Sequence, residues 1–399
     1  MADRFDVVVV GAGPAGLAAS RRALASGARV AMLDDNPAAG GQIWRGMVAE
    51  RDVPAVDRMM SARVVAAPSA GRLSVEFPQG AADLEYGALV LATGARERFL
   101  PFPGWTLPNV AGAGGLQALA KGGLPVKGKR VVVAGSGPLL LAVAKYLRDH
   151  GATIAAIAEQ ATHPAVVGFA AKLVAQPKKL MQAMQLRAGL AGVRYLTSCW
   201  PVRAVGDGEL ESVTLRRRDT QWTERCDYLA CGFGLVPNLE LASVLGCRIE
   251  NGAVAVDGQQ QTSVAHVYAA GEATGIGGLD LAIVEGEIAG LAAAGGTAER
   301  ALLAERDRHR RFAADLERAF ALRAELREMV TDDTLMCRCE DVTFGRVREC
   351  AGWREAKLHT RCGMGPCQGR VCGAAAEFLL GWHAESVRPP VFPARISTL

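Results

Sequence analysis

The chain has 399 residues, half of them apolar, with 46 glycines and a formal net charge of +4. This length predicts two or three domains, and the glycine content favours α/β layers with tight strand-to-helix turns. The mild charge, without a basic block or interleaved aromatic residues, excludes nucleic acid as a partner. Because we find neither a cleavable leader nor an unbroken apolar span, we expect a soluble, cytoplasmic protein with no transmembrane segment.

The first motif is a nucleotide-binding fingerprint. Residues 5–10 form an apolar run typical of a buried parallel strand, followed by GAGPAG and a helix-like segment. In such a loop the first glycine allows a tight turn, the second admits a pyrophosphate, and the third lets the helix pack on the strand. Proline suits the first helical turn, whose free N–H groups favour an anion. The predicted dinucleotide-binding residues of this loop are Gly11, Gly13, Pro14, Ala15 and Gly16.

An acidic residue follows the fingerprint. The next predicted strand, ARVAMLD, ends at Asp34. Its distance from the glycines is that at which a carboxylate accepts hydrogen bonds from a ribose. Asp35 is a neighbour that could take its place.

Three later segments favour FAD as the dinucleotide. They are GGQ at residues 40–42, LVLATGARE around residues 92–94, and TSVAHVYAAGEATG at residues 262–275. Together they resemble the FAD fingerprints of the two-dinucleotide-binding-domain flavoproteins. The resemblance implies that Glu272 holds the ribityl chain of FAD. The further residues assigned to FAD are Gly41, Gln42, Thr93, Gly94 and Gly271.

A second, altered fingerprint lies in the sequence VVVAGSGPLLLAVAKYL. Gly135 and Gly137 are in place, but the third glycine position is Leu140, which we expect to push the helix away from the strand. The spacing of the first site leads to Ala158 instead of an acid. Glu159 comes one step later, where a strand side chain would face the other way. We therefore predict a nicotinamide-type domain whose ligand is NAD(P), another nucleotide or nothing.

The cysteines divide into two groups. Four lie singly among apolar neighbours, where we expect them to pack as small hydrophobic residues: Cys199, Cys226, Cys231 and Cys247. The other six lie between residues 337 and 372. Reduced cytosolic thiols in such a cluster indicate metal or redox chemistry.

Four thiolates from two loops suit an iron–sulfur cluster. The predicted ligands are Cys337, Cys339, Cys362 and Cys367. Zinc also accepts four sulfurs, but structural zinc loops usually contain CxxC knuckles, and this chain has none. We therefore expect a [2Fe–2S] cluster, with zinc or unligated thiols as alternatives. Cys350 and Cys372 are spare, and Cys372 could replace Cys367.

The segments MCRCEDVTFGRVREC and TRCGMGPCQGRVC resemble a ferredoxin-like module of the bacterioferritin-associated type. This module ends the α subunits of hetero-oligomeric amine dehydrogenases and oxidases, which include opine oxidases, hydrogen cyanide synthase, hydroxyproline and proline dehydrogenases and sarcosine oxidase. FPGWTLPNVAGAGG, AGSGPLLLAVA and CGFGLVPNLELA are also similar to that family, so the resemblance covers nearly the whole chain.

The expected fold is α/β: a two-dinucleotide-binding-domain flavoprotein with a small C-terminal α+β iron–sulfur module. We place a discontinuous FAD domain at residues 1–115 and 240–296, and a degenerate NAD(P)-binding-like domain at residues 116–239. An amphipathic helical linker is expected over residues 297–335 and the [2Fe–2S] domain over residues 336–399.

The resemblance implies an oxidoreductase that works as part of a larger complex. A partner flavoprotein β subunit, similar to amino-acid oxidases, would oxidise a secondary amine or amino acid of the opine, hydroxyproline, proline or glycine type. This chain would relay the electrons through FAD and [2Fe–2S] to an acceptor such as a quinone. We assign no catalytic residue, because the six histidines are isolated and only His359 lies beside the cluster loop. The alternatives are a stand-alone NAD(P)H-dependent reductase and a zinc-stapled interaction flavoprotein.

Overall fold

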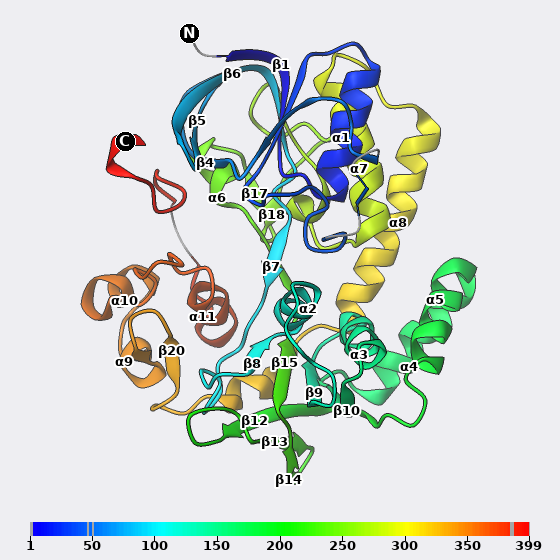
Figure 1. The fold of residues 1–399 in the computed structure, drawn as a ribbon, viewed down its shortest axis with the longest axis vertical. Helices are drawn as coiled ribbons and strands as arrows, with labels where there is room; N and C mark the ends of the chain where they lie inside the picture. Colours follow the sequence, from blue (N-terminus) through cyan, green and yellow to red (C-terminus); the bar gives the residue numbers. More distant parts are fainter. Residues whose placement is uncertain (1–2, 46–47, 50–51, 384–386, 399) are drawn as a thin grey trace. The chain divides into compact units, whose positions relative to one another are not determined.

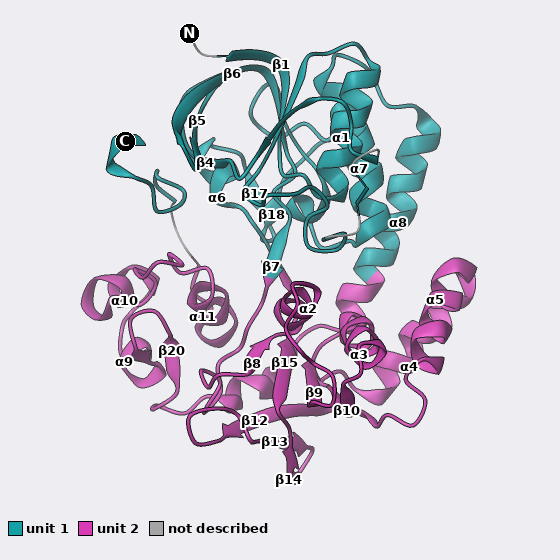
Figure 2. Ribbon diagram, viewed as in Figure 1, with its two compact units in different colours: residues 1–96, 236–314, 386–399 teal, residues 97–235, 315–385 magenta. Residues whose placement is uncertain are grey.

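The computed structural model describes residues 3–45, 48–49, 52–383 and 387–398 (Figure 1). The chain folds into two compact units (Figure 2). Unit 1 comprises residues 1–96, 236–314 and 386–399, and unit 2 comprises residues 97–235 and 315–385. The cysteine-rich segment up to residue 385 therefore belongs to the same unit as the second fingerprint, while the last residues belong to unit 1. No helix among the described residues is both long and apolar enough to cross a membrane.

Unit 1 is built on a sheet that is parallel at its centre. In order across the sheet its strands are β3 (Asp57–Met60), β2 (Val30–Asp34), β1 (Asp3–Val10), β6 (Gly80–Leu91), β5 (Arg72–Phe77) and β4 (Arg63–Ser69), with β19 (Val267–Ala269) also on β6. β1 pairs in parallel with β2 and β6, whereas β5 is antiparallel to β4 and β6. Val7, Val8 and Val9 are fully buried, as expected for a parallel strand that is covered on both faces.

Two helices cover one face of this sheet at unusually close range. α1 (Pro14–Ala25) and α7 (Leu279–Ala293) lie side by side (Figure 1). A Cβ on Gly286 would lie 2.2 Å from Ala15 O, and a Cβ on Gly290 would lie 2.2 Å from Ala19 O. Only glycine fits at these two positions, so the spacing of the two helices is set by backbone contact. The remaining elements of this unit are α6 (Glu240–Val244), β17 (Ile249–Glu250), β18 (Ala253–Val254), η3 (Gly271–Thr274) and η5 (Ile396–Thr398).

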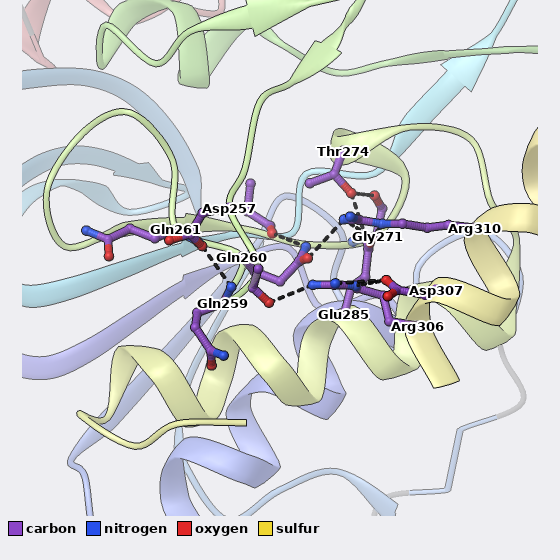
Figure 3. Close-up of polar contacts among 12 residues, drawn as sticks. Asp257, Gln259, Gln260, Gln261, Gly271, Thr274, Glu285, Arg306, Asp307 and Arg310 are labelled. Carbon is purple, nitrogen blue, oxygen red and sulfur yellow. Dashed lines mark hydrogen bonds and ion pairs between the residues drawn. The ribbon is translucent and has the colours of Figure 1, made fainter. Parts of the chain in front are cut away.

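A buried ion pair joins α7 to α8 (Arg300–Ala319) within unit 1 (Figure 3). The side chain of Glu285 is 1% exposed, and its Oε1 accepts hydrogen bonds from Arg310 Nη2 at 2.7 Å and Nε at 3.0 Å. Glu285 Oε2 accepts from Thr274 Oγ1 at 2.6 Å and from Gly271 N at 3.1 Å. Arg310 Nη2 also donates to Gln260 Oε1 at 3.0 Å. This carboxylate therefore ties α8 to the turn that carries the late flavin fingerprint.

Replacing Arg310 by Ala leaves the Glu285 carboxylate buried without its cation. We expect the variant to lose about 3 kcal/mol of unfolding free energy, because an unpaired buried charge costs far more than a surface pair contributes. Arg308→Ala is the matched control, since the Arg308 side chain is 62% exposed and forms a surface ion pair with Glu305 on the same helix. Urea unfolding of the two variants measures the difference, and equal losses would contradict the prediction.

Unit 2 contains a second parallel sheet and a small antiparallel one. The parallel strands, in order, are β11 (Tyr195–Thr197), β10 (Thr153–Glu159), β9 (Arg130–Gly135), β15 (Tyr228–Gly232) and β8 (Val110–Gly112). The antiparallel strands are β12 (Cys199–Val205), β13 (Ser212–Arg217) and β14 (Thr220–Arg225), and the short strands β7 (Ala95–Glu97) and β16 (Leu235–Pro237) lie at the unit borders. The helices are α2 (Ala113–Lys121), α3 (Leu139–Asp149), α4 (His163–Lys172), η2 (Leu173–Ala175) and α5 (Pro177–Ala188).

The orientation predicted for Glu159 is wrong. Glu159 ends β10 opposite Gly135, and its Oε2 accepts a hydrogen bond from Gly137 N at 2.8 Å. The reason is an irregularity in the pairing of β10 with β9: Ile154 pairs with Val131, but Ala156 pairs with the next residue of β9. This bulge inserts one residue into β10, which cancels the one-residue offset seen in the sequence.

Leu140 is also accommodated by its surroundings. It is fully buried on α3, and its Cδ2 lies 3.6 Å from where a Cβ on Gly232 would stand. Leu140 therefore packs as a buried side chain above Gly232.

Burial of the Glu159 carboxyl group makes the stability of the folded chain depend on pH. The residue is fully buried, and this burial raises its pKa to about 7, although Ala161 N and Gly137 N both donate to it. In the unfolded chain the group would titrate near 4.5. Between these two pH values the folded state holds the proton and the unfolded state does not, so stability falls as the pH rises.

We expect the unfolding free energy of the wild type to fall, relative to Glu159→Gln, by about 3 kcal/mol between pH 4.5 and 7. The glutamine variant keeps a carbonyl acceptor but cannot titrate, so it removes only the pH dependence of the unfolding free energy that Glu159 contributes. Urea unfolding of both proteins across this pH range gives the comparison. Parallel stability curves would show that Glu159 does not titrate there.

The cysteine-rich part of unit 2 is a small helical module with one short hairpin. Its elements are η4 (Ala324–Met329), β20 (Leu335–Cys337), β21 (Val342–Thr343), α9 (Phe344–Arg348), α10 (Trp353–Thr360) and α11 (Cys372–Leu380). Its core includes Met336, Val342, Val347 and Ala356. Trp105 Nε1 donates to Leu335 O at 2.6 Å, which connects the module to the rest of unit 2.

Candidate cofactor and thiol sites

The first glycine loop in unit 1 is fixed by close backbone contacts. Gly11 has φ +108°, and a Cβ there would lie 2.1 Å from Ala92 O. A Cβ on Gly16 would lie 1.7 Å from Gly11 O, so α1 packs directly on the loop. By contrast, a Cβ on Gly13 would meet nothing nearer than 3.9 Å. The N-terminus of α1, which begins at Pro14, therefore stands behind a loop that lets a phosphate approach at Gly13.

Asp34 is held against this loop and Asp35 is not. Asp34 is buried at the end of β2, and its Oδ2 accepts a hydrogen bond from Ala12 N at 2.6 Å. Its Oδ1 accepts from the backbone N and the side-chain Nδ2 of Asn36, both at 2.8 Å. Asp35 is exposed, and its Oδ1 accepts a hydrogen bond from Asn36 Nδ2 at 3.1 Å. Of the two acids, Asp34 has the position of a ribose acceptor.

The GGQ segment lies against the same loop. Gly40 N donates to Ala12 O at 2.8 Å, and a Cβ on Gly41 would lie 3.0 Å from the Cα of Gly13. Gln42 is exposed, and its Oε1 accepts from Arg45 Nη2 at 3.0 Å. The structure therefore brings Gly41 against Gly13 of the loop and leaves Gln42 exposed.

Thr93 and Gly94 follow β6 and are fixed by one asparagine. Thr93 Oγ1 donates to the backbone O of Asn238 at 2.8 Å, and Asn238 Nδ2 donates to Thr93 O at 2.9 Å. Asn238 N donates to Gly94 O at 3.0 Å, and Gly94 has φ +66°. This part of the predicted site is a rigid turn at the carboxyl end of a parallel strand, where open α/β sheets bind their ligands.

Glu272 carries an unused acceptor. Its Oε1 accepts from Gly278 N at 2.9 Å, whereas its Oε2 is buried and has no hydrogen-bond partner among the described residues. Burial raises the pKa of this carboxyl group. The preceding residue, Gly271, has φ +72°, and a Cβ on it would lie 2.8 Å from the Cβ of Ala15 at the start of α1. A buried acceptor beside the glycine loop fits a hydroxyl donor of a bound dinucleotide.

Five thiols gather in unit 2. The Sγ atoms of Cys337, Cys362 and Cys372 all lie within 4.8 Å of one another, and all three residues are buried. Cys339 and Cys367 form a second contact, with a hydrogen bond between their side chains. The structure thus brings Cys372, which the sequence offered as a substitute for Cys367, together with two of the predicted ligands, Cys337 and Cys362.

Three chain segments supply the buried thiols. Cys337 ends β20, Cys362 follows α10 and Cys372 begins α11. Gly365, between the last two, leaves no room for a side chain, because its Cβ would lie 2.3 Å from the Cβ of Cys339. The glycines of the GMGP turn therefore let two loops approach closely.

The environment of Cys337 favours a thiolate. Hydrogen bonds from the thiols of Cys362 and Cys372, and from Gly363 N and Glu340 N, lower its pKa far below the usual range of a thiol. The same contact with Cys337 raises the pKa of Cys362 to about 12. A set of soft sulfur donors around one anionic centre suits an iron–sulfur cluster or a thiophilic metal ion.

The remaining cysteines and the histidine are separate from this group. Cys350 lies outside it, and its Sγ donates to Arg346 O at 3.7 Å. His359 is exposed on α10. The isolated cysteines are buried, as the sequence predicted: Cys199, Cys226, Cys231 and Cys247.

The second glycine loop differs from the first in what covers it. A Cβ on Gly135 would lie 1.9 Å from Gly232 O, so the tight turn itself is retained. Gly137 faces the ring of Phe320, whose Cγ lies 3.7 Å from the position of a Cβ. Ser136 Oγ donates to Phe320 O at 2.8 Å, and Gln160 Nε2 donates to Ser136 Oγ at 2.9 Å, so both residues belong to this site, although the sequence did not single them out. A serine between two glycines was the one local signal.

Comparison with known proteins identifies the family of this chain. The family described as pyridine nucleotide-disulphide oxidoreductase matches residues 5–294. The A subunit of opine oxidase from Rhizobium meliloti (strain 1021) is 33% identical, over 98% of this chain and 97% of that protein. The HcnB subunit of hydrogen cyanide synthase from Pseudomonas aeruginosa is 32% identical, over 92% of this chain and 90% of that protein.

Solved structures show the same fold. L-proline dehydrogenase from P. horikoshii covers all of this chain and 80% of its own, with a TM-score of 0.69 and 18% identity. Thioredoxin reductase of T. acidophilum covers 73% of this chain and 98% of its own, with a TM-score of 0.57 and 22% identity. The chain is thus an oxidoreductase of the pyridine nucleotide-disulphide oxidoreductase family and belongs, within it, to the group that contains HcnB and the A subunit of opine oxidase.

Proposed function

We propose that the chain is the electron-transfer subunit of a hetero-oligomeric amine or amino-acid dehydrogenase or oxidase. The observation that carries the proposal is the gathering of five thiols in unit 2 of a chain whose unit 1 has the loops of a flavoprotein. A flavin exchanges electrons in pairs and an iron–sulfur cluster exchanges them singly, so the two together convert one kind of transfer into the other.

Unit 1 would hold FAD through groups that its fold has already oriented. The N-terminus of α1 and the open backbone at Gly13 receive the pyrophosphate. Asp34 accepts from a ribose hydroxyl, since its bond to Ala12 N fixes the carboxylate beside the loop. Glu272 accepts from the ribityl chain through its buried Oε2, which no described residue contacts by a hydrogen bond.

Unit 2 would hold the [2Fe–2S] cluster. The candidates for its four ligand positions are a buried group of three thiols and a contacting pair: Cys337, Cys362 and Cys372, and Cys339 and Cys367. We assign Cys372 to the ligand set, because its sulfur lies with those of Cys337 and Cys362 in the buried part of the group. Cys350 lies outside this group and supplies a matched control.

The partner and the substrate are proposed from the relatives. Those relatives are named as subunits of opine oxidase and hydrogen cyanide synthase. We therefore propose that a second flavoprotein, similar to amino-acid oxidases, oxidises a secondary amine or amino acid of the opine, hydroxyproline, proline or glycine type. This chain takes up the electrons in the cytoplasm and passes them to an acceptor such as a quinone.

The assembled complex, and not the isolated chain, should oxidise the amine. Expression of the chain alone, and together with the flavoprotein encoded beside it, allows both to be assayed with opines, proline, hydroxyproline and glycine and an artificial electron acceptor. We expect turnover only when both proteins are present, because we identify no acid/base pair beside the flavin loops within the described ranges. Full turnover by the isolated chain would refute the proposed relay role.

Cysteine variants test the metal centre directly. We expect Cys337→Ser and Cys372→Ser to lower bound iron and acid-labile sulfide about tenfold, because structural thiolate ligands contribute most of the binding energy of a metal site. Cys350→Ser should retain the wild-type content. Iron, sulfide and zinc analysis of the anaerobically purified proteins gives the result. Zinc without iron or sulfide would favour the zinc-stapled alternative, and a full iron content in Cys372→Ser would remove that residue from the ligand set.

A further inference from the structure

A short peptide of the chain itself lies across the second glycine loop. This segment, residues 320–323, follows α8 and is referred to here as the plug segment. Ser136 Oγ, between the two glycines, donates to Phe320 O at 2.8 Å. Gln160 Nε2 donates to Ala321 O at 3.1 Å and to Phe320 O at 3.3 Å. In return, Arg323 N donates to Gln160 Oε1 at 3.1 Å.

The aromatic ring of the plug segment covers the glycine that a dinucleotide needs. A Cβ on Gly137 would lie 3.7 Å from the Cγ of Phe320, so the ring is in van der Waals contact with the loop. The ring of Phe169 meets it edge-on, with 5.3 Å between the ring centroids. In a dinucleotide site the second glycine lets the backbone approach the pyrophosphate. Here that approach is filled by Phe320.

The polar groups at the loop already form hydrogen bonds within the protein. Gly137 N donates to Glu159, so it does not face a phosphate. Gln160 is fully buried and uses both ends of its amide on the plug segment and Ser136. A ligand that displaced the segment would leave this amide unpaired unless it offered both carbonyl acceptors and an N–H donor. A pyrophosphate offers acceptors only.

The plug segment is anchored on both sides within unit 2. Just before it, Asp315 forms an ion pair with Lys172 on α4 at 2.5 Å. Just after it, Leu326 and Met329 are fully buried in the core of the unit. The guanidinium of Arg323 lies over the ring of Trp200, with 5.3 Å to the ring centroid. These contacts make the segment a packed part of the fold.

We propose that the second nucleotide site does not take NAD(P), because the plug segment is its occupant. The site keeps the strand, turn and helix of a nicotinamide domain and uses them to bind residues 320–323. Neither NADH nor NADPH therefore supplies electrons to this chain through that site. This inference goes beyond the proposed function, since a relay protein could work with or without a free nucleotide site.

Nucleotide addition to the full-length, flavin-loaded chain tests the proposal. Hydrogen–deuterium exchange of the peptide around residues 319–326 is measured with and without NADH or NADPH at about 1 mM, the upper end of the usual range of KM values. We expect unchanged exchange and no bleaching of the flavin under anaerobic conditions. Faster exchange in this peptide, or rapid bleaching, would overturn the proposal. Neither readout depends on the iron content or on amine turnover, which test the proposed function.

A variant tests whether Gln160 holds the segment. We expect Gln160→Ala to speed exchange of the peptide around residues 319–326 about tenfold, the loss expected for a buried hydrogen bond. Gln185→Ala, on the exposed face of α5, is the matched control and should leave exchange at the wild-type rate. Equal exchange in the two variants would show that the segment is not bound through Gln160. If Gln160→Ala does not fold, the nucleotide experiment on the wild type still decides the proposal.

Discussion

Contact between backbones, without intervening side chains, is the constraint on which unit 1 depends. Gly16 brings α1 onto the turn at Gly11, and Gly286 and Gly290 bring α7 onto α1. A Cβ at any of these positions would lie within about two ångströms of a carbonyl oxygen. The same contacts place Gly13 and the Glu272 turn at the N-terminus of α1, so the close packing of the helices also shapes the proposed cofactor site.

The geometry of the first glycine loop and its acid could be predicted because its information is local. A strand, a glycine loop, a helix and a strand-end acid follow one another within one short stretch, and the structure joins Asp34 to that loop by a single hydrogen bond. At the second site, the same counting of residues gave the wrong orientation for Glu159. Counting residues assumes that both strands are regular, and the bulge between Ile154 and Ala156 breaks that assumption. Bulges arise from pairing across the sheet, which spacing along one strand does not reveal.

The contacts that were missed join residues far apart in the chain. Ser136 and Phe320 are separated by 184 positions, and no pattern near either residue signals the other. The thiols show the same limit. Spacing identified a cluster of cysteines and suggested Cys372 as a substitute, but only the folding of β20, the GMGP loop and α11 decides which sulfurs meet. The position of the Glu285–Arg310 pair depends likewise on how α7 and α8 pack.

The filled second site changes what redesign of this protein would require. Comparison of motifs suggests that reinstating the missing glycine at position 140 would return nicotinamide reactivity. In this fold, replacing Leu140 by glycine would leave a cavity above Gly232, and Phe320 would still cover the loop. Opening the site would first require removing or rerouting the peptide after α8. The buried amide of Gln160 would then need new hydrogen-bond partners.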